Sequence, residues 1–230
     1  AGNMCCGTWT QKATTGPSQR YRDAMAYARN CNRVVLFGGL GNGPNPAGAL
    51  DDTWEWDGTT MTWTQFSPAV KPPARGGHTM AYDSARNRVV LFGGLTGSFG
   101  VFNDTWEYNC STHTWTQMNP ANSPPGRFGH AMAYDPNLGV SVINGGQSTN
   151  QDTWTWNGTN WTQVAGGNQP GIRYDHGMAF DGLRVILFGG NKNAGLAAND
   201  TWGFTGTAWT QLAVTGPSQG ERLGLLRVSL

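Results

Sequence analysis

The sequence predicts an all-β fold built from repeated four-stranded sheets. The tripeptide Trp-Thr-Gln occurs five times, beginning at Trp9, Trp63, Trp115, Trp161 and Trp209. A Gly-Gly pair after an apolar run and an Asp-Thr-Trp triplet lie between consecutive copies. Landmarks that recur in a fixed order, with a period of about 50 residues, are typical of repeat architectures. No stretch keeps a 3.6-residue periodicity over the length of a helix.

The second repeat shows how one unit divides into strands. Its first strand lies within residues 72–83, and the others are expected at 88–94, 103–108 and 114–117. Each run is short, rich in β-branched or aromatic residues, and bounded by Gly, Pro, Asn or Asp, as strands are. The other repeats carry the same pattern, with first strands at 23–27, 130–134 and 176–180, second strands at 33–39, 139–146 and 184–190, and third strands beginning at Asp52, Asp152 and Asp200.

Alternation along the first strand assigns its side chains to two faces. His78, Met80 and Tyr82 share one face, whereas Thr79 and Ala81 share the other, and the remaining repeats keep this division into large and small residues. One large and one small face suit an innermost strand where sheets crowd around an axis. The sequence therefore predicts a β-propeller of four-stranded antiparallel blades, in which the large faces pack blade against blade.

The motif set is similar to that of a known family. Leu91-Phe92-Gly93-Gly94, followed by Asp104-Thr105-Trp106 and Trp115-Thr116-Gln117, resembles the kelch repeat of the galactose oxidase and kelch-like superfamily. The resemblance covers nearly the whole chain and implies a kelch-type propeller. The third complete unit departs mildly, with Val142-Ile143-Asn144-Gly145-Gly146 in place of Leu-Phe-Gly-Gly.

The ends of the chain do not match a whole number of repeats. We expect a single propeller domain over residues 1–230, with four complete blades at about 17–65, 72–117, 124–163 and 170–211. A lone outer strand is expected at 8–11, and a further unit begins within 216–230, where Gly216-Pro217-Ser218-Gln219 repeats residues 16–19. Two interpretations follow: a fragment of a longer propeller, or an open or four-bladed ring.

Composition excludes some classes of function. Charged residues make up 13% of the chain and the net charge is +1, without a basic run, so a nucleic-acid partner has no electrostatic support. No apolar run is long enough to span a membrane. Lysine occurs only at Lys12, Lys71 and Lys192 while Asn, Thr and Trp are frequent, and this composition favours an extracellular or periplasmic location.

The cysteines form no recognisable framework. Cys5, Cys6, Cys31 and Cys110 are too few and too irregularly spaced for a disulfide scaffold or a zinc site. Cys31 and Cys110 fall in turns on the face of the propeller with short loops. Either the four are thiols, or one of the adjacent pair Cys5 and Cys6 bridges Cys31.

The second-to-third-strand loops and the links between blades share the other face, called here the long-loop face. They differ in length and sequence, so this face is where a binding surface is expected. One arginine of each repeat begins an innermost strand there, and the four could form a cationic ring for an anionic or polyhydroxyl ligand: Arg20, Arg75, Arg127 and Arg173. Alternatively, each arginine pairs with an aspartate of its own repeat: Asp52, Asp104, Asp152 or Asp200. Further candidate ligand-binding residues on this face are Phe99, Phe102, Asn42 and Asn191.

No catalytic or metal-binding motif stands out. His78, His130 and His176 face the neighbouring blade singly, so no metal site is expected, and no cofactor is implied. The nucleophile and phosphate-loop motifs are missing. We therefore expect a non-catalytic kelch module that binds a protein or a glycan through the long-loop face. The alternative is a kelch-like sugar-active enzyme of epimerase or oxidase type that holds an acidic sugar at the channel mouth.

Overall fold

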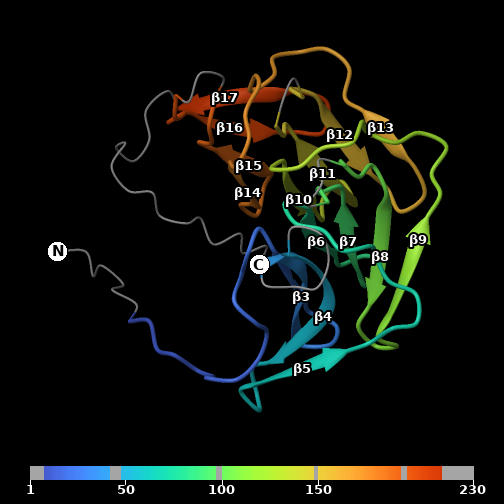
Figure 1. Cartoon of the computed structure of the whole chain (residues 1–230). Coiled ribbons are helices and arrows are strands. Elements are labelled where there is room, and N and C mark those ends of the chain that lie inside the picture. Colours follow the sequence, from blue (N-terminus) through green and yellow to red (C-terminus); the bar gives the residue numbers. More distant parts are fainter. Residues whose placement is uncertain (1–7, 42–47, 97–99, 148–149, 193–195, 214–230) are drawn as a thin grey trace.

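The computed structural model shows an all-β chain, and it describes residues 8–41, 48–96, 100–147, 150–192 and 196–213. Within these residues the regular structure consists of antiparallel strands, which form four sheets (Figure 1). In each sheet neighbouring strands follow the order of the sequence, except that the first two strands of the first sheet both pair with its third strand. No helix in the described part of the chain is long and apolar enough to cross a membrane.

The first sheet is the largest of the four, with five strands. It comprises β1 (Arg20–Tyr21), β2 (Ala24–Ala28), β3 (Arg33–Gly41), β4 (Ala49–Asp57) and β5 (Thr62–Phe66). The strand β3 continues beyond its Gly-Gly pair, so that β1 pairs with its far end while β2 pairs with its beginning. A register shift at the glycines, between Phe37 and Gly39, accommodates this extension against β4.

The other three sheets have four strands each. They comprise β6 (Thr79–Asp83), β7 (Arg88–Phe92), β8 (Thr105–Asn109) and β9 (Thr114–Met118); β10 (Ala131–Asp135), β11 (Val140–Asn144), β12 (Thr153–Trp156) and β13 (Trp161–Gln163); and β14 (Gly177–Phe180), β15 (Val185–Phe188), β16 (Thr201–Phe204) and β17 (Trp209–Ala213). The sheets follow one another along an arc, as the blades of a propeller do (Figure 1). Contacts link their first strands in succession, β2 to β6, β6 to β10 and β10 to β14. The prediction of an all-β fold made of four-stranded propeller blades is therefore confirmed.

The hydrophobic core lies between consecutive blades, because each blade packs its small face on the large face of the next. Ala24, Ala26 and Ala28 of the first blade are buried against Met80 and Trp106 of the second. The next two interfaces repeat this arrangement. Close packing against small residues lets large aromatic rings bury most of their area, which is the main favourable term in such an interface.

A hydrogen bond fixes each of these interfaces near the outer rim. The indole of an outer-strand tryptophan donates to the threonine hydroxyl of the Asp-Thr-Trp triplet in the preceding blade. The three bonds are Trp115 to Thr53 at 2.9 Å, Trp161 to Thr105 at 2.8 Å and Trp209 to Thr153 at 2.8 Å. The tryptophan of Trp-Thr-Gln and the threonine of Asp-Thr-Trp therefore recur together because they bond across blades.

The first copy of Trp-Thr-Gln behaves differently. The prediction of an outer strand at residues 8–11 is wrong for this structure, because those residues form no strand and Trp9 is 89% exposed. An outer strand needs a third strand beside it to complete its hydrogen bonds. The described residues provide no such neighbour for 8–11. The further unit expected at 216–230 lies outside the described residues.

Candidate functional site

Each blade contains the same polar network on the long-loop face. The arginine before the first strand forms a two-bond ion pair with the aspartate of Asp-Thr-Trp, and its guanidinium also donates to the carbonyl of the first glycine of Gly-Gly. In the second blade, Arg75 lies 2.6 and 2.8 Å from the carboxylate of Asp104 and 2.9 Å from the Gly93 oxygen. The same aspartate accepts a bond of 2.8 Å from the Trp106 indole. This network explains why the arginine, the Gly-Gly pair and the Asp-Thr-Trp triplet recur together.

The other blades repeat these bonds with little change. The shortest arginine–aspartate distances are 2.7 Å in Arg20–Asp52, 2.7 Å in Arg127–Asp152 and 2.9 Å in Arg173–Asp200. The side chains of Arg75, Arg127 and Arg173 are 0% exposed. The alternative in which each arginine pairs with an aspartate of its own repeat is therefore confirmed. Ligand contact by the four arginines stays a prediction, and a ligand would have to displace an aspartate to reach them.

The ion pairs lower the pKa values of Asp52, Asp152 and Asp200. Burial alone would raise the pKa of Asp152, but hydrogen bonds from Arg127 and Trp154 and the guanidinium charge outweigh it and lower that pKa. The pKa values of Asp52 and Asp200 are lowered by the same balance of causes. These carboxylates stay charged and engaged, so none is available as a general acid near neutral pH.

The Gly-Gly pair joins this network to the next blade. Gly93 and Gly94 have φ values of 69° and 102°, a region that favours glycine. The Gly94 amide donates to the backbone oxygen of Arg127 at 2.8 Å, and a Cβ at Gly93 would lie 2.6 Å from that same oxygen. Both the backbone angle and the close approach of the following blade therefore require glycine.

The remaining candidate residues have various positions. Phe102 is half-buried and its ring lies 3.9 Å from the Arg75 guanidinium carbon, a cation–π contact that supports the ion pair. Asn191 is half-buried and exchanges two backbone hydrogen bonds with Tyr174. Phe99 and Asn42 lie outside the described residues. Ligand binding by these four residues stays a prediction.

A chain of backbone hydrogen bonds runs around the axis just beyond the arginines. The Gly77 amide donates to the Arg22 oxygen at 2.7 Å, Gly129 to Gly77 at 3.0 Å, and Asp175 to Gly129 at 2.7 Å. All four residues have positive φ, with 56° at Arg22 and 54° at Asp175. Arginine seldom adopts this conformation, whereas the equivalent positions of the second and third blades hold glycine. Backbone strain of this kind is concentrated at functional sites.

The side chains around this chain of bonds form a surface whose residues differ from blade to blade. We call it the mouth surface: Tyr21, Arg22, Phe128, Tyr174 and Asp175. Tyr21 is 61% exposed, Arg22 and Asp175 are exposed, and the two other rings are half-buried. The Arg22 guanidinium lies 5.7 Å from the centre of the Phe128 ring, which links the first blade to the third across the glycines of the second. The sequence carried a signal for it, because the residue after the repeat arginine is aromatic in three of the four blades.

The recurrent histidines occupy the predicted place between blades. His130 Nε2 lies 2.7 Å from the Thr79 hydroxyl of the preceding blade, and its ring meets Phe92 edge-on. His78 meets Phe37 of its own preceding blade in the same way. The described residues contain no group of three or more His, Cys, Asp or Glu side chains able to hold a metal ion.

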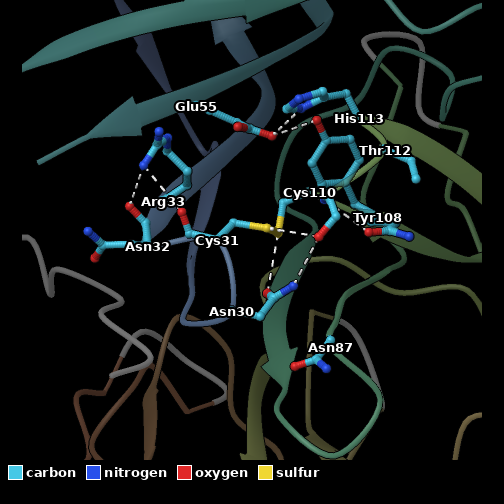
Figure 2. The surroundings of a disulfide bond; sticks show 12 residues. Asn30, Cys31, Asn32, Arg33, Glu55, Asn87, Tyr108, Cys110, Thr112 and His113 are labelled. Carbon is cyan, nitrogen blue, oxygen red and sulfur yellow. Dashed lines mark hydrogen bonds and ion pairs between the residues drawn. A yellow bond between two sulfur atoms is a disulfide. The ribbon is translucent and has the colours of Figure 1, made fainter. Parts of the chain in front are cut away.

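On the opposite face, a disulfide joins the first two blades. Cys31, in the turn between β2 and β3, is bonded to Cys110, in the turn between β8 and β9, with their Cα atoms 6.2 Å apart (Figure 2). The expectation of thiols or of a bridge from Cys5 or Cys6 is therefore wrong for Cys31. Neighbouring blades place these two turns side by side, a proximity that spacing along the chain does not show. Beside the bridge, the buried Glu55 accepts hydrogen bonds from Tyr108 and His113.

The four-stranded blades, their inter-blade tryptophan bonds and the repeated arginine–aspartate network define a β-propeller repeat protein. The family model described as the KLHDC2/KLHL20/DRC7 Kelch-repeats domain matches residues 3–146, and the chain belongs to this kelch-repeat family.

Similar proteins include Kelch domain-containing protein 2 of Bos taurus, which is 30% identical over 146 residues. Kelch domain-containing protein 10 of Homo sapiens is 28% identical over 151 residues. These matches cover 62% and 64% of this chain, and 34% and 33% of the relatives. Multiple epidermal growth factor-like domains protein 8 of Mus musculus is 32% identical over 136 residues, which cover 55% of this chain and 5% of that protein. The chain thus corresponds to a minor part of each relative.

Proposed function

We propose that this chain is a non-catalytic binding module that recognises a protein through the mouth surface and the adjoining loops of the long-loop face. Its membership of the kelch-repeat family supports a binding role, since kelch repeats are typically protein-interaction modules. The recurrent polar residues are engaged in holding the blades together. What is left for recognition is the part that differs between blades.

The observation that carries the proposal is the composition and exposure of the mouth surface. Aromatic rings and arginine are enriched at the centres of protein interfaces, where they supply most of the binding energy. Tyr21, Phe128 and Tyr174 provide the rings, while Arg22 and Asp175 provide opposite charges. Because a continuous backbone chain supports them, these side chains are held in place before a partner arrives, which reduces the entropy lost on binding.

The test begins with peptides selected from a phage-displayed random library against the intact chain. Binding of a selected peptide is measured for the wild type, for Tyr174→Ala, and for Arg22→Asn, where asparagine tolerates the left-handed backbone. We expect each variant to weaken binding by about tenfold or more, as hot-spot residues do. The control is Asn137→Ala, in an exposed turn of the opposite face, and it should bind like the wild type.

Loss of binding in Asn137→Ala with full binding in both mouth variants would contradict the proposed surface. Selective binding to immobilised glycans, with no protein or peptide bound, would contradict the proposed class of partner. Turnover of a sugar acid by the wild type that disappears in a folded Arg75→Ala variant would instead favour the enzymatic alternative.

We also propose that the chain works in an oxidising compartment, outside the cytoplasm. The disulfide between Cys31 and Cys110 supports this, because such bonds persist in secreted or periplasmic proteins and are rare in a reducing cytosol. Alkylation of the denatured chain, taken from its native source, should label neither of these two cysteines unless it is first reduced. Quantitative labelling without reduction would contradict the proposed location.

A further inference from the structure

The three interfaces between blades share one set of paired parts. The innermost strand of the later blade inserts a methionine, Met80, Met132 or Met178, against small residues of the earlier blade. The outer tryptophan of the later blade bonds to the threonine of the earlier one, as described above. Every interface therefore has a large half, supplied by the later blade, and a small half, supplied by the earlier blade.

A third pair of parts lies on the short-loop face. The turn after the innermost strand of one blade contacts the turn after the third strand of the later blade. The contact falls at the equivalent position in all three interfaces. Cys31 bonds to Cys110, a Cβ added at Gly158 would lie 2.5 Å from Arg86, and one at Gly206 would lie 3.3 Å from Leu138. The chemistry changes from one interface to the next, but the position is constant.

The fourth blade presents a small half that no described residue of another blade covers. Ala179 is exposed, although its equivalents Ala26, Ala81 and Ala133 are at most 2% exposed. Ile186 is half-buried, while its equivalents in the other blades are fully buried. Thr201 takes the threonine position, and Leu183, in the turn after the first strand, is exposed.

The first blade presents the matching large half. Met25, Trp56 and Trp63 are half-buried, whereas the methionines of the second and third blades and the equivalent rings of all later blades are buried. Gly58 stands where Cys110, Gly158 and Gly206 stand in the later blades, and the space around it is open, with the nearest side-chain atom 3.8 Å from an added Cβ. The segment before the first blade touches this face at Gly16, against the Trp63 ring.

We propose that a second copy of this chain covers both faces, with the small face of the fourth blade in one copy packed on the large face of the first blade in the other. Met25 would then meet Ala179, Trp63 would donate to Thr201, and Leu183 would fill the space beside Gly58. This contact continues an interface that the chain already forms three times within itself. Two such contacts, related by a two-fold axis, close a ring. The blades that the structure describes in the two copies would together number eight, the upper end of the usual range for propellers.

Sedimentation velocity of the 230-residue chain over a dilution series tests the proposal. We expect a species of twice the 24.7 kDa chain mass that dissociates on dilution. Ala179→Glu and Met25→Lys should each yield monomers with an unchanged circular dichroism spectrum, because both positions are on open faces of a single copy. Gln211→Glu, an exposed position of the fourth blade on the side towards the third, is the matched control and should remain dimeric.

Mixing the two variants separates this contact from any other mode of association. An Ala179→Glu copy and a Met25→Lys copy can form a mixed ring with one wild-type contact and one contact between opposite charges. The equimolar mixture should therefore recover the dimer that neither variant forms alone. A wild-type chain that stays monomeric throughout the series, or a dimer insensitive to both substitutions, would overturn the proposal and leave these faces to other blades or to residues 214–230. Neither result bears on the mouth surface.

Discussion

Replacing Asp152 with asparagine is expected to lower the free energy of unfolding by about 3–5 kcal/mol, the range measured when one member of a buried ion pair is removed. The Arg127 guanidinium is fully buried, and its bonds of 2.7 and 3.1 Å to Asp152 are its only contacts with a negative charge among the described residues. Asparagine keeps the shape of the side chain but leaves that positive charge without compensation. Urea denaturation should show a lower midpoint with an unchanged slope.

The control for this variant is Asp51→Asn. Asp51 pairs with Lys71 at 3.0 Å, but both side chains are more than a third exposed, so the loss should stay below about 1 kcal/mol. An Asp152→Asn variant that costs no more than Asp51→Asn would show that the buried network does not hold the blade.

The pH dependence of the free energy of unfolding tests the role of the Asp152 charge in a second way. Because the pKa of Asp152 is lower in the folded chain than in the unfolded one, its stabilisation is fully present above the unfolded value, near 3.8, and is lost as the pH falls towards the folded value. The difference in stability between the wild type and Asp152→Asn should therefore shrink below about pH 4. A constant difference down to strongly acidic pH would contradict the assigned role of the charge.

Removing the disulfide by Cys31→Ser with Cys110→Ser is expected to cost about 2–4 kcal/mol. The bond links residues 79 positions apart, so reduction releases a long loop in the unfolded chain and increases its conformational entropy. The bond also ties the first blade to the second at their turns. A lower melting temperature, measured by circular dichroism, should follow from the double substitution.

Reducing agent provides the control for this second prediction. Dithiothreitol should lower the melting temperature of the wild type towards that of the double-serine variant, and should leave the variant itself unchanged. If the wild type melts at the same temperature when thiol labelling shows that the bond is fully reduced, the disulfide does not stabilise the fold.

The strands and blades could be predicted because their chemistry recurs. The positions of Trp115 and Thr53 keep the same residue types in every repeat because these residues bond across blades. The positions of Arg75 and Asp104 do so because these residues pair within a single blade. Gly93 recurs because the backbone of the next blade leaves no room for a Cβ. Of these contacts, the sequence alone was enough to propose the arginine–aspartate pair, whereas the bond between blades and the close approach at Gly93 needed the structure.

The disulfide, the mouth surface and the conformation of the first Trp-Thr-Gln copy depend on how the blades are arranged in space, which the repeat does not encode. Cys31 and Cys110 occur once each, and only the placement of neighbouring turns brings them together. The mouth surface depends on the left-handed backbone at Arg22. It also depends on the contact between the Arg22 guanidinium and the Phe128 ring, across the glycines of the second blade. Trp9 carries the full motif, yet a motif forms a strand only where another strand lies beside it.

The bonds made by the second glycine of each pair have a consequence for how the chain folds. Gly39, Gly94 and Gly146 donate their amides to an arginine oxygen of the following blade. A blade therefore completes its own backbone hydrogen bonds only when its successor is in place, and stability is shared between neighbours as in other repeat proteins. Folding is expected to propagate from blade to blade. In a single copy of the chain, the fourth blade, whose Gly190 donates to no later arginine among the described residues, should be the first to open.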